Sequence, residues 1–207
     1  IEALKQGVDI SMITSACTAR IMSNHLDERE KAWQLIHSPA VGLSPDKESF
    51  AAMVREALYT GKIIAYAQGF SLMQDASRLY GWNLDLGKIA SIFRAGCIIQ
   101  AVFLNDITHA FEAEPKPENL IFDGFFLSRI NEHQDSLRQA VSTGVMNGLP
   151  IPALCNAVSY LDEFRAKAAG ANLIQAQRDC FGAHTYERTD REGVFHHEWR
   201  WANDNQH

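Results

Sequence analysis

The chain has 207 residues, of which 46% are hydrophobic, and 19 basic against 25 acidic side chains give it a formal net charge of −6. A chain of this length and composition can bury a core of its own. It contains no block of Lys or Arg of the kind that follows a phosphate backbone, which argues against nucleic acid as a partner.

The cysteines stand singly, without a CxxC pair or a small disulfide scaffold around them. No stretch approaches the roughly 20 apolar residues that span a bilayer, and the first residues lack the pattern of a signal peptide. We therefore expect reduced thiols and a cytoplasmic protein without a membrane partner. The four cysteines are Cys17, Cys97, Cys155 and Cys180.

The chain begins with Ile rather than Met, and residues 1–4 have the character of the last turn of a helix. We therefore expect a fragment of a longer protein, with active-site residues among what precedes it. After a break at Gly7, apolar residues at helical spacing predict one amphipathic helix from about residue 10 to 37, ended by Pro39.

A long helix is predicted to begin at Ser44-Pro45, because Ser can cap the first turn and Pro fits the first helical position. No breaker follows until Gly81. Roughly 35 residues, each rising about 1.5 Å, give a long rod. Residues 63–70 are apolar on most sides of this rod, which predicts that other helices surround it.

Shorter helices separated by Gly or Pro are predicted after this rod. No segment alternates for long enough to form a central strand. The predicted fold class is all-α, a large helical bundle with a long central helix and an extended C-terminal tail. The shorter helices are expected at about 86–94, 97–113, 125–147, 152–168 and 171–181.

Two stretches of the sequence share one pattern. Residues 7–13, followed by Ala16, and residues 148–154, followed by Ala157, both place a Gly stop, a short apolar elbow and a new helix at the same spacing. Two explanations stay open. The chain contains a duplicated helical unit, or any pair of antiparallel helices needs such an elbow.

The stretch from about Gly182 to His207 is charged and rich in His, with Phe195, Trp199 and Trp201 among polar neighbours. It cannot form a core alone. Aromatic side chains of this size are costly to leave in water, so the tail packs on its own bundle or docks on another chain. A second subunit would cover these aromatic side chains most simply.

Several common motifs of nucleotide-binding and catalytic sites are missing from the sequence. It has no glycine-rich phosphate fingerprint, no HExxH and no GxSxG. We therefore expect no dinucleotide site of the Rossmann kind in this chain. The pair His196-His197 points apart and lacks a surrounding ligand set, so no metal site is expected.

Arg178 and His184 flank a helix stop that Gly182 is expected to make. They could converge on one anion, since Arg offers a rigid fork that matches phosphate or carboxylate and His adds a second donor. The alternative is a surface arginine that pairs with Asp179 or Glu187.

Arg20 lies on a helix face with small neighbours, which would leave space for a ligand beside its guanidinium. The alternative is a solvated helix arginine, and the physical pattern alone does not choose between them. The small neighbours are Ala16, Cys17, Ser23 and Asn24.

Residues 172–179 (NLIQAQRD) and 181–186 (FGAHTY) resemble the C-terminal signature of 6-phosphogluconate dehydrogenases. The resemblance extends over essentially the whole chain, through residues 57–59 (ALY), 61–64 (GKII), 66–70 (YAQGF), 92–99 (IFRAGCII) and 192–196 (EGVFH). Two departures are Gln100, where relatives often have Arg, and Cys180, where they often have an aromatic residue; both concern local packing more than substrate class.

The resemblance implies an enzyme that oxidises 6-phosphogluconate at C3 with NADP and releases CO2 to give ribulose 5-phosphate, in the pentose phosphate pathway. By the same resemblance, this reaction requires no metal ion. An N-terminal Rossmann domain would hold NADP, and residues 1–181 would form the helical domain that completes the substrate pocket and makes the homodimer. Residues 182–207 would cross to the partner subunit.

By motif, Arg20 resembles a substrate-binding arginine of the family, and Arg178 and His184 resemble the pair that one subunit delivers to its partner's active site. The family's general-base lysine and general-acid glutamate would lie upstream, so no catalytic residue is expected in this chain, which alone would be inactive. Two rival readings are a stand-alone helical dimerisation module without sugar-phosphate binding and the C-terminal domain of another β-hydroxyacid dehydrogenase.

Overall fold

The computed structural model describes residues 1–38, 42, 46–94, 96–168 and 170–199. The chain divides into two compact units, Ile1–Leu161 and Asp162–His207. The assignment of residues 1–181 to a substrate and dimerisation domain and of 182–207 to a crossing tail stays a prediction. In the described ranges, no helix is both long and apolar enough to cross a bilayer.

The first unit opens with three short helices, where two were expected. Helix α1 (Glu2–Gln6) ends at Gly7, which has a left-handed φ of 70°. Helices α2 (Ser11–Met22) and α3 (Leu26–Leu35) occupy the stretch for which one continuous helix was predicted, and that prediction is wrong. Pro39, expected to end it, lies outside the described residues.

The break between α2 and α3 has a local cause. The Ser23 hydroxyl donates to the Arg20 carbonyl oxygen at 2.6 Å, and the Asn24 side chain accepts from the Arg20 guanidinium at 2.8 Å. Side chains of Ser and Asn that bond nearby groups in this way compete with the helical backbone. The helix therefore stops after Met22, and His25 precedes the next one.

Helix α4 (Lys47–Tyr80) is the long central helix that was predicted. Its N-cap is Asp46, whose carboxylate accepts from the backbone N–H of Ser49 at 2.9 Å, and Gly81 ends it in the left-handed conformation. The expected start at Ser44-Pro45 falls outside the described residues. Capping signals at both ends thus enclose one uninterrupted rod.

Helices α5 (Leu86–Ile92) and α6 (Leu104–Glu112) follow, and the second is shorter than predicted. Residues 97–103 were expected to be helical and are not. The side chains of Lys62 and Tyr66 on α4 donate to the carbonyl oxygens of Gln100 and Ile99, so these carbonyls are bonded to α4 instead of to a following turn. A tertiary contact here overrides local helix propensity.

The 3-10 turn η1 (Leu120–Phe122) leads into α7 (Gly124–Met146), which is capped by the Asp123 carboxylate. Helix α8 (Pro152–Arg165) then follows the Gly148 elbow. Gly148 and Gly7 have φ values of 66° and 70°, so the two echoing segments share the same left-handed turn. Duplication of a helical unit stays a prediction.

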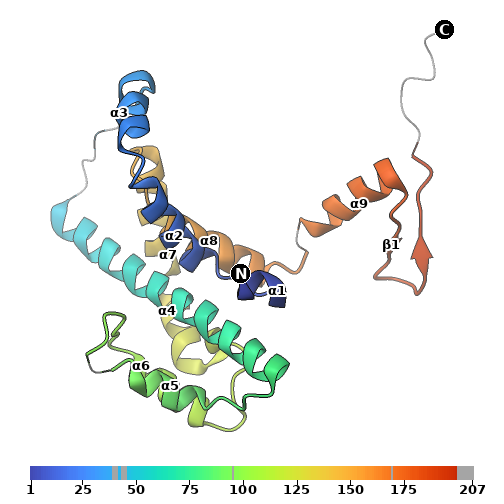
Figure 1. The fold of residues 1–207 in the computed structure, drawn as a ribbon, viewed down its shortest axis with the longest axis horizontal. Helices are drawn as coiled ribbons and strands as arrows, with labels where there is room; N and C mark the ends of the chain where they lie inside the picture. The colour runs from blue at the N-terminus through green and yellow to red at the C-terminus, as the bar shows by residue number, and fades with distance from the viewer. Residues whose placement is uncertain (39–41, 43–45, 95, 169, 200–207) are drawn as a thin grey trace. The chain divides into compact units, whose positions relative to one another are not determined.

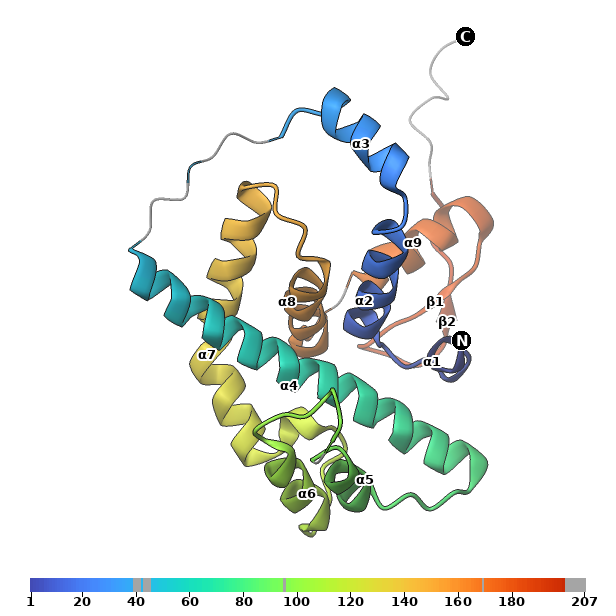
Figure 2. The same cartoon turned by 60° about the vertical axis from the view of Figure 1, so that its left-hand side comes forward.

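The core of the first unit lies where α4, α7 and the α5–α6 pair meet, with α7 crossing α4 (Figures 1 and 2). Phe103 is 1% exposed and meets Tyr59, Tyr66 and Phe126 edge-on, with centroid separations of 5.5, 5.5 and 5.8 Å. Aromatic and aliphatic side chains thus surround α4, as its sequence predicts.

The second unit contains helix α9 (Ala171–Gly182) and a short hairpin. Strands β1 (Tyr186–Glu187) and β2 (Val194–Phe195) pair antiparallel, with Tyr186 opposite Phe195. The hairpin lies within residues 182–207, for which an extended tail was predicted, and Trp201 lies outside the described residues. The all-α fold class is confirmed.

Candidate functional site

Arg20 lies in the last turn of α2, on the surface. One terminal nitrogen of its guanidinium donates to the Ser23 hydroxyl at 2.6 Å and to the Asn24 side chain at 2.8 Å. The small polar neighbours noted in the sequence therefore hold the guanidinium in place. Its second terminal nitrogen has no protein acceptor among the described contacts.

Gln68 fixes the start of α2 on α4. Its side chain is completely buried, and its carbonyl oxygen accepts the backbone N–H of Met12 at 3.1 Å. Its amide nitrogen donates to the Asp9 carboxylate at 2.9 Å and to the Ser11 hydroxyl at 3.0 Å. This buried amide therefore determines where the helix that carries Arg20 begins.

Arg178 lies on the exposed surface of α9, in the second unit. Its guanidinium donates to the side-chain oxygen of Gln175 at 3.1 Å, one turn earlier on the helix. The alternative partners considered for it, Asp179 and Glu187, are not bonded to it in the described contacts. Arg178 thus keeps donors available to an anion.

His184 lies two residues after the last residue of α9, and the end of this helix differs from expectation by one residue. Gly182 was predicted to stop the helix, but it is the last helical residue, and Ala183 makes the left-handed cap with a φ of 49°. The glycine serves another purpose. A Cβ atom at position 182 would lie 2.8 Å from Nε2 of His184, so a larger residue there would require the imidazole to move from its present position.

The backbone on both sides of His184 is left-handed. Ala183 has a φ of 49° and Thr185 a φ of 59°. For a β-branched residue such as Thr this conformation is a true outlier, and conformations of this kind persist only where the surroundings impose them. Strain of this kind is concentrated at functional sites.

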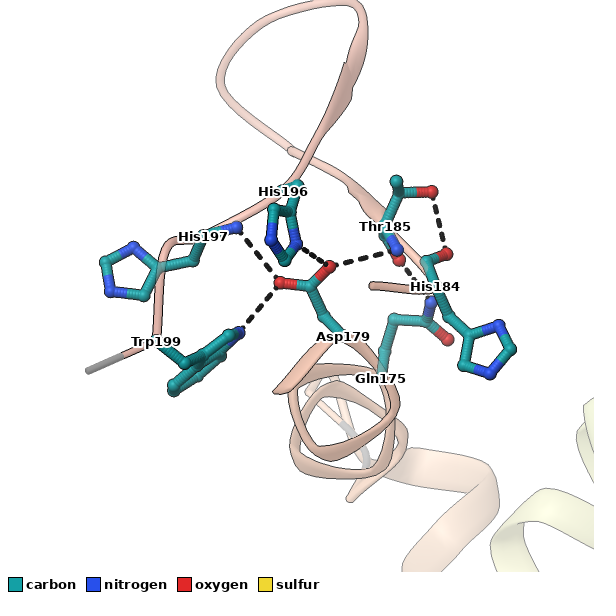
Figure 3. A network of polar contacts seen from close by, with 7 residues as sticks. All are labelled: Gln175, Asp179, His184, Thr185, His196, His197 and Trp199. Atoms are coloured by element: carbon teal, nitrogen blue, oxygen red, sulfur yellow. Dashed lines mark hydrogen bonds and ion pairs between the residues drawn. The ribbon is translucent and has the colours of Figure 1, made fainter. Parts of the chain in front are cut away.

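Asp179 lies at the centre of this region and was not singled out from the sequence (Figure 3). It is completely buried. One carboxylate oxygen accepts from the Thr185 backbone N–H at 3.0 Å and contacts the His196 imidazole at 2.8 Å. The other accepts from the His197 backbone N–H at 3.0 Å and from the Trp199 indole at 2.9 Å.

These four contacts decide the protonation state of the carboxylate. Burial raises the pKa of Asp179, but the contacts with His196, His197, Trp199 and Thr185 outweigh it and hold the pKa well below its ordinary value. The group is therefore a carboxylate near neutral pH. Its negative charge is matched by donors that come from both ends of the hairpin.

Gln175 joins the two predicted site residues and was also missed. Its oxygen accepts from Arg178, and its amide nitrogen donates to the carbonyl oxygen of Thr185, next to His184. The structure thus links Arg178 to the backbone beside His184 through one amide. Arg20 belongs to the other unit, and its approach to this pair stays a prediction.

The sequence did contain a signal for Asp179. A carboxylate near the end of a helix that precedes a tail rich in His and Trp is the natural acceptor for their N–H groups. No group of three or more His, Cys, Asp or Glu side chains in the described part of the chain is placed to hold a metal ion.

Fold and site together define a helical protein in which α9 carries Arg178 and is followed by His184 and a hydrogen-bonded hairpin. The family model described as 6-phosphogluconate dehydrogenase, C-terminal domain, matches residues 1–199. The chain belongs to this family, as its signature residues predicted.

Curated relatives and a solved structure agree with this assignment. The chain is 48% identical over 197 residues to the decarboxylating 6-phosphogluconate dehydrogenase of Lactococcus lactis subsp. lactis (strain IL1403). The aligned residues make up 95% of this chain and 42% of the relative. The enzyme of the same name from Staphylococcus aureus (strain N315) is 47% identical over 199 residues, 96% of this chain and 42% of the relative.

The structure of Plasmodium falciparum 6-phosphogluconate dehydrogenase matches with a TM-score of 0.89 and 38% identity, over 96% of this chain and 43% of that one. That protein was solved in its apo form, with its cofactor NADP+ and with its substrate 6-phosphogluconate. The chain therefore spans less than half the length of the relatives it matches.

Proposed function

We propose that this chain is the substrate-binding and dimer-forming domain of an NADP-dependent dehydrogenase that converts 6-phosphogluconate to ribulose 5-phosphate and CO2, in the pentose phosphate pathway. The observation that carries the proposal is the linked pair Arg178 and His184, held at a strained helix end by Gln175 and Asp179. The names of the relatives support the same activity.

Arg20, Arg178 and His184 bind the sugar phosphate in this proposal. A guanidinium fork pairs with two oxygens of a phosphate or carboxylate, and the imidazole adds a further donor. Their contribution is to position the substrate and to balance its charge. NADP, which takes up the hydride when bound, and the residues that move protons belong to the part of the enzyme outside this chain, so the chain alone gives no turnover.

Removal of any one of these three side chains should weaken substrate binding. Each lost charged hydrogen bond costs roughly 1.5–3 kcal/mol, which corresponds to roughly a ten- to 150-fold rise in the dissociation constant. We expect this result for Arg20→Ala, Arg178→Ala and His184→Ala in the complete protein, measured by equilibrium binding of 6-phosphogluconate and by NADPH formation.

Arg188→Ala is the matched control, because Arg188 lies in the same unit but is paired with Asp190 at 2.6 Å. It should leave binding unchanged. Absence of NADPH formation by the wild-type protein would remove the proposed activity. Unchanged binding in all three variants would instead favour a helical module that only assembles with a partner.

We also propose that residues 182–207 cross to a second subunit, so that Arg20 of one copy and Arg178 and His184 of the other serve one site. The exposed aromatic residues Phe181 and Trp199 support this, since 65% and 38% of their surfaces are exposed in the single chain. A cytoplasmic location is part of the proposal and is supported by the unpaired cysteines.

A shared site predicts complementation between two inactive variants. A mixed dimer of one Arg20→Ala subunit and one Arg178→Ala subunit contains one doubly altered site and one intact site, so about half of the wild-type activity should return. The mixed dimer is purified with two different affinity tags and assayed for NADPH formation. Activity no higher than that of the two parent dimers would contradict the shared site.

A further inference from the structure

The conformation of His184 is imposed by one residue of the preceding helix. The backbone N–H of Ala183 donates to the backbone carbonyl oxygen of Asp179 at 2.9 Å, and that of Thr185 donates to the Asp179 carboxylate at 3.0 Å. Both left-handed residues that flank His184 are thus held by residue 179. The second bond ties the unfavourable φ of Thr185 to the buried carboxylate of α9.

The same carboxylate also reaches Arg178 indirectly. The Thr185 carbonyl oxygen, fixed by the bond at its N–H, anchors the amide nitrogen of Gln175, and this orients the Gln175 oxygen toward the Arg178 guanidinium. Gln175 and Asp179 lie four residues apart on α9 and so share a face. One connected set of hydrogen bonds therefore runs from Asp179 to both groups.

We propose that Asp179 is a positioning residue that sets the relative placement of His184 and Arg178 through Thr185 and Gln175. This inference rests on the proposed function, in which those two groups bind the sugar phosphate. It assigns the specific geometry of that anion site to a buried carboxylate that does not itself touch the ligand.

Direct contact between Asp179 and an anionic substrate is excluded by its surroundings. Its side chain is completely buried, and each carboxylate oxygen already has two protein partners. In Figure 3 the His184 ring points away from the carboxylate, on the side opposite to His197 and Trp199. A carboxylate acts on this site only through the backbone that it holds.

The test variant is Asp179→Asn in the complete protein. Asn keeps the shape of Asp but loses the charge, and its NH2 group replaces an acceptor with a donor. We expect the KM for 6-phosphogluconate to rise about tenfold or more, with kcat and the KM for NADP changed less than about twofold, since the binding that is lost is equal in the bound substrate and in the transition state.

A double-mutant cycle distinguishes positioning from general stabilisation of the fold. If Asp179 acts through His184 and Arg178, then adding Asp179→Asn to the double variant Arg178→Ala/His184→Ala raises the KM by less than about twofold further, because both groups that it positions are already gone. Asp190→Asn is the matched control. It removes another carboxylate of the same hairpin, which pairs with Arg188 on the surface, and should leave the KM unchanged.

A full, additive effect of Asp179→Asn in the Arg178→Ala/His184→Ala background would overturn the inference, as would an unchanged KM in Asp179→Asn alone. If Asp179→Asn does not fold, Gln175→Met carries the test. This variant leaves Asp179 intact and removes both hydrogen bonds of the Gln175 amide. It should raise the KM for 6-phosphogluconate in the wild-type background and cause no further rise when it is combined with Arg178→Ala. An unchanged KM in Gln175→Met would contradict the inference. If Arg178→Ala and His184→Ala themselves have no effect, the proposed function has failed as well, and the two failures are distinguished.

Discussion

The two units of this chain are stabilised by opposite means. In the first, the fully buried side chains around α4 are mostly apolar, with Phe103, Phe126 and Leu137 at 1% exposure or less. In the described part of the second, the one buried residue is a carboxylate, Asp179. The first unit excludes water from a core, whereas the second organises its backbone around a charge.

The size of each unit explains the difference. A unit of fewer than 50 residues buries too small a fraction of its surface to depend on an apolar core. A buried charge needs several donors with correct directions, and each donor fixes a point of the chain. Such a network adds little stability per residue but fixes backbone positions closely, which is what an anion site requires.

The largest effect should come from breaking the apolar core. Phe103→Ala removes a ring that meets three other aromatic rings, and such a truncation costs about 3–5 kcal/mol of unfolding free energy. Urea denaturation followed by circular dichroism measures it. Phe125→Ala is the matched control, because Phe125 is 36% exposed and should cost well under half as much.

An equal loss in the two Phe variants would contradict a core centred on α4. The comparison between units adds a second readout. Hydrogen exchange at the amides of Thr185 and His197 should change less in Phe103→Ala than exchange in α7, because those amides are bonded to Asp179 and not to the core.

Local signals explain which parts of the fold could be predicted. The extent of α4 follows from a run without breakers and from Gly81 at its end, so sequence alone was sufficient. The break after Met22 depends on the Ser23 hydroxyl, which competes with the helical backbone for the carbonyl oxygen of Arg20. The late start of α6 depends on hydrogen-bond donors that lie 33 and 38 residues away in the chain. Periodicity does not detect either kind of interaction.

The candidate site divides in the same way. Arg178 and His184 were found because their chemistry and their signature are visible in the sequence. Asp179 was considered only as a surface partner for Arg178, because its burial depends on donors 6, 17, 18 and 20 residues further on. A carboxylate that becomes buried only when a polar tail folds back over it has no apolar pattern to reveal it.

The smallest change in overall stability should come from acid, and it should be confined to the second unit. The folded-state pKa of Asp179 is depressed below its ordinary value of 3.8, so its contribution is complete above that value and is lost as the pH falls toward the folded-state pKa. His196 is the titratable side chain in contact with it. We therefore expect the hairpin to stay docked on α9 between about pH 5 and 8 and to loosen below about pH 4.

Hydrogen exchange at Thr185 and His197, corrected for the intrinsic rate, should then rise about tenfold on acidification, while exchange at Ile64 in α4 stays within about twofold. Asp179→Asn provides the control. Its exchange should be faster at neutral pH and should depend on acid much less than that of the wild type, because Asn does not titrate. If the hairpin and α4 lost protection together, or if the Asn variant kept the acid dependence, the hairpin would owe its order to something other than this carboxylate.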